Sequence, residues 1–185
     1  MNRRLILANL AGFPFGRLLA QDEAPRPRHR ISAGQLHKML SARFPVRLGV
    51  AGLLQLQVSA PRLLLLPSRN RLGAALLAQA DGLPDGQLPP GEMDLVFALR
   101  YEATDQTVRA HGAQVLDVRW PGLPRDAVEF VQGLVPALAA QVGEIVLHRF
   151  SPGELALPDT MGFEPEELKV HDDGLEVIFG PKRRR

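Results

Sequence analysis

Apolar and polar residues alternate along much of residues 47–120, which is the pattern of strands with one buried face. In the stretch LLQLQVSAPRLLLL, Leu54, Leu56 and Val58 alternate with polar residues, and then four leucines, residues 63–66, follow without interruption. Short turns separate the alternating stretches, so we predict an antiparallel sheet. The expected strands are about 47–60, 62–66, 71–80, 94–101 and 116–120.

A short helix is predicted over residues 31–44, near the N-terminal end of the domain. Ser32 and Gln35 have the spacing of a capping box, in which each side chain accepts a hydrogen bond from the backbone N–H of the other residue. Ile31 and Leu36 occupy the two positions of a hydrophobic staple. An apolar stripe follows, and the proline after the segment ends the helix.

A longer helix is predicted within RDAVEFVQGLVPALAAQVGEIVLHRF, residues 125–150. On a helix, its apolar side chains fall within an arc of roughly 160°, and Leu134 and Leu138 lie near the centre of this arc. An arc of this width favours a helix that is held in a concave surface. Pro136 removes a backbone hydrogen bond on the polar side, so the helix is expected to bend or to divide into two pieces.

The chain is predicted to end in a hairpin with the two-residue turn Asp173–Gly174. In that register Val170 faces Val177, and apolar residues meet on one face of the hairpin. His171 faces Glu176 on the other face, where the two side chains can form an ion pair. We therefore interpret His171 as a structural residue of the hairpin.

Residues 1–20 have the layout of a secretory signal peptide. Arg3 and Arg4 come first, an apolar run over residues 5–15 follows, and Ala20 precedes a polar segment. The adjacent arginines also resemble a twin-arginine export signal. We therefore expect export with cleavage after Ala20, and a disordered basic N-terminus is the alternative. The apolar run is about half the roughly 20 residues that span a membrane, so no stable transmembrane segment is expected.

Composition indicates one globular domain, with 45% hydrophobic and 23% charged residues. We place this domain at residues 31–181, after a proline-containing linker at 21–30 and before a basic tail at 182–185. Aromatic residues make up only 5% of the chain and the net charge is +2, which argues against a nucleic-acid partner. The chain has no cysteine, which excludes disulfides, thiolate metal sites and an acyl anchor on cysteine.

No motif in the sequence predicts catalysis. The chain lacks a Gly-x-Ser-x-Gly elbow, a Walker loop and a His-Glu-x-x-His motif. Its five histidines are too scattered for local metal-ligand spacing, and they are His29, His37, His111, His148 and His171. The sequence therefore predicts a non-enzymatic protein with no catalytic residues, no cofactor and no metal site.

Three stretches, in this order, resemble the YceB-like lipoproteins, a bacterial envelope family of unknown function. They are ISAGQLHKMLSARFP, RLLLLPSRNRLG and LALPDTMGFEPEELKVHDDGLEVIF, and the resemblance covers about residues 31–181. The family is similar to one half of the tubular lipid-binding proteins, in which a curved antiparallel sheet wraps a long helix and an apolar groove holds lipid. The chain departs from the lipoproteins in having no cysteine near Ala20, which implies a soluble periplasmic form.

The expected fold is therefore α+β, with a curved antiparallel sheet wrapped around a long C-terminal helix, a short N-terminal helix and a C-terminal hairpin. The resemblance implies an apolar groove between sheet and helix. The residues that we expect to line it are Leu134 and Leu138 on the helix and Leu64 and Phe97 on facing strands.

The leucine run at residues 63–66 has two interpretations. In the first, residues 31–44 or the Gly/Pro-rich loop at 81–92 cover its second face as ordinary core. In the second, part of the leucine surface lines the lipid groove.

Two functions remain open at this point. The first is an envelope protein that binds a lipid, a fatty acid or another apolar ligand. The second is a small periplasmic structural or adaptor protein that has a fully packed core, no ligand and an envelope protein as its partner. An apolar tunnel of several hundred cubic ångströms would favour the first. Native packing density throughout would favour the second.

Overall fold

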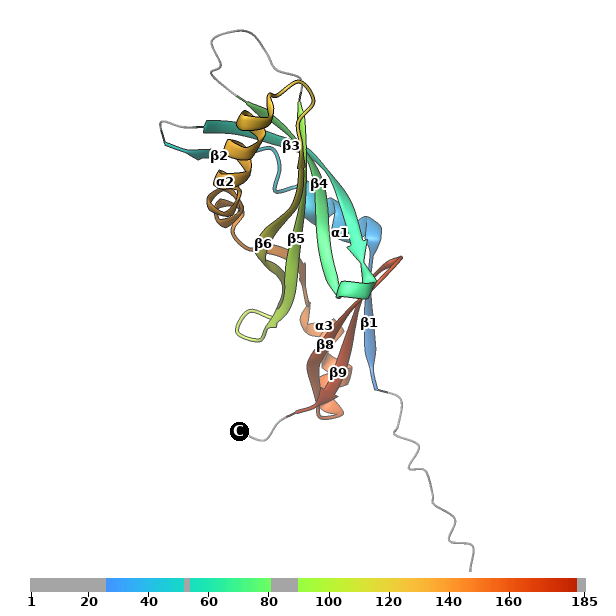
Figure 1. Cartoon of the computed structure of the whole chain (residues 1–185). Coiled ribbons are helices and arrows are strands. Elements are labelled where there is room, and N and C mark those ends of the chain that lie inside the picture. Colours follow the sequence, from blue (N-terminus) through green and yellow to red (C-terminus); the bar gives the residue numbers. More distant parts are fainter. Residues whose placement is uncertain (1–25, 52–53, 81–89, 183–185) are drawn as a thin grey trace, which may run out of the picture.

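The computed structural model describes residues 26–51, 54–80 and 90–182 (Figure 1). The strands are β1 Arg28–Ser32, β2 Val46–Val50, β3 Leu54–Leu66, β4 Arg71–Ala80, β5 Gly91–Glu102, β6 Thr107–Arg119, β7 Ile145–Arg149, β8 Phe163–His171 and β9 Gly174–Pro181. The helices are α1 Ala33–Ser41, α2 Arg125–Val142 and α3 Pro152–Thr160, with one 3-10 turn, η1, at Pro67–Arg69.

Two antiparallel sheets make up most of the described chain. The larger sheet has six strands in the order β2-β3-β4-β5-β6-β7, and the smaller has the order β1-β9-β8. The larger sheet is curled, and the smaller lies at one end of it (Figure 1). Helix α2 contacts β6 and β2, while α1 contacts β3 and β7. Each helix therefore bridges strands that are not neighbours in the curled sheet.

The expected fold, a sheet wrapped around a long C-terminal helix, is wrong. The molecule is mostly β, with three short helices and a curled antiparallel sheet. Residues 125–150 contain an 18-residue helix, α2, which runs through Pro136 and ends at Val142. The next residue, Gly143, has a φ of +69°, a conformation that suits glycine and stops the helix. Ile145 and Val146, which share the predicted apolar arc, then lie in β7.

The predicted N-terminal helix is present as α1, and its capping box is formed. The Ser32 hydroxyl accepts a hydrogen bond from the Gln35 backbone N–H at 3.3 Å, and the Gln35 side chain accepts one from the Ser32 N–H at 2.9 Å. Ile31 and Leu36 are both buried. Ile31 belongs to β1, however, so the end of the segment predicted as a linker, Arg28–Arg30, pairs with β9 as a strand.

The strands predicted before and after Pro61 are one strand, β3. Its register with β4 shifts around Pro61, where an irregular pairing tolerates a residue that has no N–H. Val58 faces the core before this point, and Leu63 and Leu65 pack against the core after it. The four-leucine run therefore alternates like any strand, and Leu64 points to the opposite face.

The C-terminal hairpin is present, but its turn lies one residue earlier than expected, at Asp172–Asp173. Val170 consequently pairs with Leu175. The partner of Val170 therefore moves by two residues, from Val177 to Leu175. The apolar side chains stay on the same face, because side chains alternate with a period of two. His171 and Glu176 still approach each other, diagonally, with 3.6 Å between Nε2 and Oε2.

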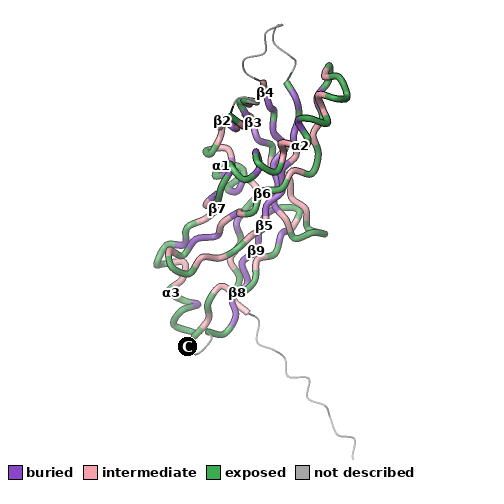
Figure 2. Tube along the Cα trace, turned by 60° about the vertical axis from the view of Figure 1, so that its left-hand side comes forward, coloured by how far each residue is buried: buried purple, intermediate pink, exposed green. Residues whose placement is uncertain are grey.

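One hydrophobic core connects both sheets and two of the helices. Figure 2 shows buried residues recurring along the strands. The largest fully buried side chains are Phe97, Phe179, Ile31, Leu36, Leu40, Leu56, Leu72, Leu76, Leu95, Leu138, Leu147 and Leu175. These side chains come from α1, α2 and strands of both sheets, so the described residues pack as one domain.

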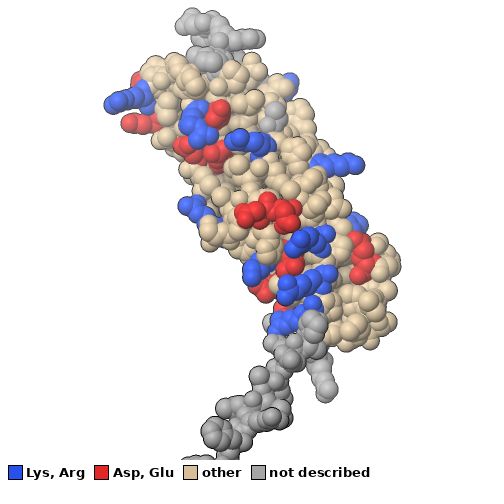
Figure 3. All heavy atoms as spheres, turned by 90° about the vertical axis from the view of Figure 1, so that its right-hand side faces the viewer, with Lys and Arg blue, Asp and Glu red and all other residues tan. Residues whose placement is uncertain are grey.

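The basic residues before the predicted domain are matched by acids of the C-terminal hairpin. Lys and Arg side chains alternate with Asp and Glu beside the start of β1 (Figure 3). The ion pairs are Arg26–Glu166 at 3.2 Å, Arg28–Glu176 at 3.4 Å and Arg30–Asp173 at 3.3 Å. The pairs Arg26–Glu166 and Arg30–Asp173 are exposed and each contributes little by itself, whereas Glu176 is buried. Together the three pairs neutralise the basic cluster that the sequence shows at this end of the chain.

The predicted signal peptide, residues 1–20, lies outside the described residues. Within the described part of the chain, no helix combines the length and the hydropathy needed to cross a bilayer.

Candidate functional site

The four residues predicted to line an apolar groove occupy different environments. Phe97 and Leu138 are 0% and 1% exposed and belong to the hydrophobic core. Leu134 is partly buried and packs against the same core. Leu64 pairs with Gly73 and lies on the opposite face of the sheet from Phe97, because β3 and β4 alternate regularly here. The structure brings the other three to the core side.

The C-terminal end of α2 is held by the side chain of Gln141, which forms the two hydrogen bonds that a neighbouring strand would form with β2. Gln141 Nε2 donates to the Gly49 carbonyl at 2.7 Å, and Gln141 Oε1 accepts from the Gly49 N–H at 3.0 Å. Both backbone groups of Gly49 lie on β2, the edge strand of the large sheet, and would otherwise be unpaired. Leu138, Ala139 and Val142 bury the same half of the helix.

The N-terminal half of α2 buries Val131 but also leaves apolar surface exposed. Phe130 on α2 is 49% exposed and Leu116 on β6 is 46% exposed. Between the helix and β6 is a hollow of about 160 Å³, which is lined by Val115, Leu116, Val118 and Val135 and by the polar residues Asp117 and Gln132. We refer to the apolar residues Val115, Leu116, Val118, Phe130 and Val135 as the α2–β6 seam. A second hollow, of about 420 Å³, is lined by residues of β2 and β3 and by Ala51, which follows β2.

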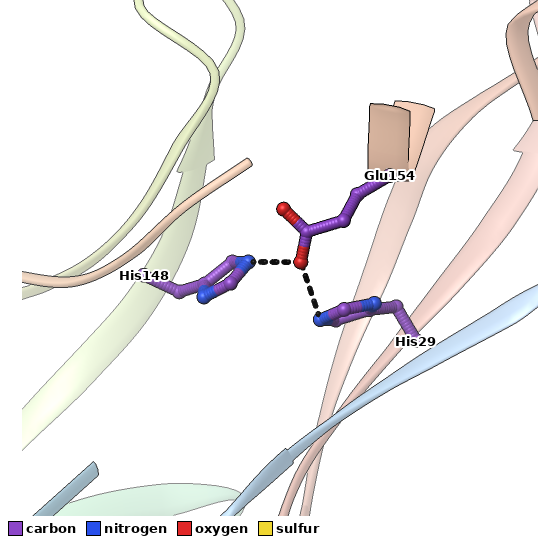
Figure 4. A group of neighbouring side chains, drawn as sticks. All are labelled: His29, His148 and Glu154. Carbon is purple, nitrogen blue, oxygen red and sulfur yellow. Dashed lines mark ion pairs between the residues drawn. The ribbon is translucent and has the colours of Figure 1, made fainter. Parts of the chain in front are cut away.

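A polar cluster lies where the two sheets meet, and three separate elements supply it. His29 comes from β1, His148 from β7 and Glu154 from α3 (Figure 4). Glu154 Oε1 lies 3.3 Å from His148 Nε2 and 3.5 Å from His29 Nε2. The three side chains are partly buried, so solvent reaches only part of the cluster.

Glu154 is oriented by the capping box of its own helix. The Ser151 N–H and hydroxyl both donate to Glu154 Oε2 at 2.7 Å, and the Ser151 hydroxyl accepts from the Glu154 N–H at 3.4 Å. These bonds hold one carboxylate oxygen and leave Oε1 facing the two histidines. The hydrogen bonds from Ser151, followed by the nearby histidines, lower the pKa of Glu154.

The two imidazoles are packed against an aromatic ring from the core. The ring of buried Phe150 has its centroid 4.7 Å from His148 and 5.1 Å from His29, and the two imidazoles are 5.0 Å apart. Burial lowers the pKa of His29, the charge of His148 lowers it further, and Glu154 opposes both effects. His29 is therefore favoured in its neutral form at pH 7.

We expect the protein, after any bound metal ion has been removed with a chelator, to lose stability as the pH falls from 7.5 to 5.5. The folded state holds the pKa of His29 below its ordinary value of 6.5, so the unfolded chain binds a proton more readily. This contribution is complete above pH 6.5 and declines as the pH falls toward the lower folded pKa. Urea midpoints across this range test the expectation.

His29→Gln should flatten the pH dependence, because it removes the imidazole whose pKa is lowered in the folded state. Equal slopes for the wild type and His29→Gln would contradict the assignment. Glu154 contributes outside this range, because the stability it provides is lost only as the pH falls through a folded pKa below 4.5.

Sequence reasoning missed this cluster. His148 was expected at the end of the long helix, but it lies in β7 and pairs with Val108. One signal was available, because Ser151 and Glu154 have the spacing of a capping box, which predicts the start of α3. No local pattern indicates that β1 and β7 approach each other, so only the fold unites His29 with His148.

Comparisons with protein families and with curated proteins give no match for this chain. The resemblance to the YceB-like lipoproteins therefore rests on the sequence, through the three stretches and the predicted order of helices and strands, and stays a prediction.

Proposed function

We propose that the protein is a non-enzymatic binding protein of the bacterial envelope that holds a lipid or fatty acid beside α2. The observation that carries the proposal is the apolar surface of the α2–β6 seam, where Phe130 and Leu116 are about half exposed. Covering apolar surface contributes roughly 25 cal/mol per Å², so an acyl chain along this seam would gain binding energy.

Helix α2 supplies a means of admitting such a ligand. The hollow of about 160 Å³ is smaller than the roughly 300–1,000 Å³ of common ligand pockets, so the seam has to widen. The Gln141–Gly49 contacts hold the C-terminal half. Pro136 lies between the two halves and cannot donate the hydrogen bond that would join them at this point. In this proposal the N-terminal half swings outward about Pro136 and exposes Leu134 together with Val131, which is buried in the closed arrangement.

The envelope location rests on sequence. The predicted signal peptide at residues 1–20 and the resemblance to the YceB-like lipoproteins both support a periplasmic protein. The absence of cysteine argues against an acyl tether, so the proposed protein takes up a ligand from solution or from a membrane surface without being anchored.

Leu134→Trp is expected to weaken binding of a fluorescent fatty acid by at least about tenfold, because Leu134 lies on the half of α2 that is proposed to move and the larger ring would fill the space opened there. The melting temperature should change little, since Leu134 is only partly buried. The matched control is Leu157→Trp on α3, a position that is exposed and far along the chain from the seam. The control should bind as the wild type does.

Fluorescence titration of the wild type and both variants decides the matter. Saturable binding at micromolar concentrations that Leu134→Trp weakens supports the proposal. An absence of saturable binding to the wild type, or equal binding by wild type and Leu134→Trp, would reject it.

The second candidate function is a structural or adaptor protein without a ligand. It is favoured by the burial of Phe97 and Leu138, which both belong to the packed hydrophobic core. In such a core Leu138→Trp overpacks the interior and costs roughly 1–3 kcal/mol. The exposed residues of the seam would then contact an envelope protein, and the fatty-acid titration would show no binding.

A further inference from the structure

We propose that His29, His148 and Glu154 form a binding site for a zinc ion or a similar divalent transition-metal ion. Each side chain offers one ligand atom, and the three atoms lie within 4.8 Å of one another. This site is separate from the α2–β6 seam, and the proposal does not depend on the function proposed above.

The two distances from the carboxylate oxygen to the imidazole nitrogens match those of a tetrahedral site. Zinc bonds to imidazole nitrogen and carboxylate oxygen are about 2.0–2.2 Å long, which places neighbouring ligand atoms roughly 3.3–3.5 Å apart in a tetrahedron. Glu154 Oε1 lies 3.3 Å from His148 Nε2 and 3.5 Å from His29 Nε2 (Figure 4). Two imidazoles and one carboxylate leave a fourth position for water, which the partial exposure of the cluster allows.

Hydrogen bonding does not explain the arrangement as well. His148 Nε2 is buried, and no described residue forms a hydrogen bond with it. Its separation from Glu154 Oε1 exceeds the usual 2.7–3.2 Å of a hydrogen bond between nitrogen and oxygen. A cation between the three atoms would satisfy the buried nitrogen and the facing carboxylate oxygen together.

Neighbouring residues orient both the carboxylate and the imidazoles toward the position of the proposed metal ion. The capping box holds Glu154 Oε2, so Oε1 is already directed at the histidines. Phe150 packs against both imidazole rings and limits their rotation. Neutral imidazole is the form that binds metal, and burial lowers the pKa of His29 in that direction. This donor set suits zinc, and also iron, nickel or copper, better than magnesium or calcium.

Binding of the ion would join three elements from both sheets, β1, β7 and α3, and would therefore stabilise the fold. The test uses the untagged full chain, stripped with EDTA and titrated with ZnCl₂ by isothermal calorimetry. We expect one ion per chain. At a hundredfold excess over the Kd, the melting temperature should rise by roughly 5–10 °C.

Glu154→Gln is the most informative variant, because glutamine also serves at this position of a capping box but lacks the carboxylate charge. We expect Glu154→Gln, His29→Gln and His148→Gln each to weaken zinc binding at least about 100-fold. His37→Gln and His171→Gln, outside the cluster, should bind zinc as the wild type does. The proposal is overturned if the wild type takes up no zinc at one ion per chain, or if Glu154→Gln keeps its circular dichroism spectrum and also its zinc affinity.

Discussion

Gly174→Val is expected to destabilise the protein by about 3 kcal/mol or more. A Cβ at Gly174 would collide with the carbonyl oxygen of Ile31 and would lie 3.1 Å from Ser32 Cα and 3.2 Å from the Ala33 nitrogen. All three are backbone atoms of β1 and the start of α1, so no side chain can rotate to make room. The sequence predicted a requirement for glycine in the turn, whereas the structure places it in the pairing of β9 with β1.

Urea unfolding of the wild type, Gly174→Ala and Gly174→Val measures this effect. Alanine alone should cost much of the stability, because its Cβ already makes the contact. Gly133→Ala is the matched control, since an added Cβ there meets nothing within 4 Å on α2 and should stabilise the helix by roughly 0.5–1 kcal/mol. A midpoint for Gly174→Val equal to that of the wild type would refute the close approach of the two strands.

Phe97→Ala should cost about 3–5 kcal/mol, the range for removing a large side chain from a packed core. Phe97 is 0% exposed and pairs with Leu72 of β4, on the same face as the residues that α1 and α2 cover. Phe130→Ala on the exposed side of α2 is the control, and it should change the free energy of unfolding by about 0.5 kcal/mol or less. Both values come from denaturant titration.

A loss below about 1 kcal/mol for Phe97→Ala would mean that the space around this ring is not tightly packed. Phe97 would then be able to line a preformed groove. The expected large loss instead excludes a ligand from the space around Phe97, because a ligand cannot occupy space that the core side chains already fill.

Local sequence signals predicted the elements whose cause is local. The Ser32 and Gln35 capping box identified the start of α1 within about a residue. Alternating apolar residues identified the antiparallel strands around β4, β5 and β6. The final hairpin was also predicted, although its turn lies one residue earlier than expected and Gly174 pairs with Ser32 of β1. That pairing joins segments far apart in the sequence, so no local pattern contains it.

The C-terminal part of the long apolar segment was predicted wrongly because its pattern fits two structures. Ile145 and Val146 extend the apolar arc of a helix, and they fit equally well in a short strand. Gly143 was the signal against a continuous helix, and its positive φ ends α2. Pairing of β7 with β6 then decides the outcome, and this pairing is a tertiary effect.

The candidate sites were less predictable than the fold. Leu64 was predicted to line one groove together with Phe97, but the two side chains lie on opposite faces of the sheet. The irregular pairing at Pro61 changes which residues of β3 face the core. The polar cluster needs β1, β7 and α3 to meet. Only Glu154 carries a local signal, through its capping box with Ser151.

Native mass spectrometry of the full chain, purified from the bacterial envelope under gentle conditions, tests the proposed function most directly. We predict that the wild type carries the added mass of a lipid or fatty acid, that organic extraction releases it, and that Leu134→Trp carries much less of it. The mass of the bare chain alone, from wild type and variant alike, would contradict ligand binding beside α2 and leave the adaptor as the function of this protein.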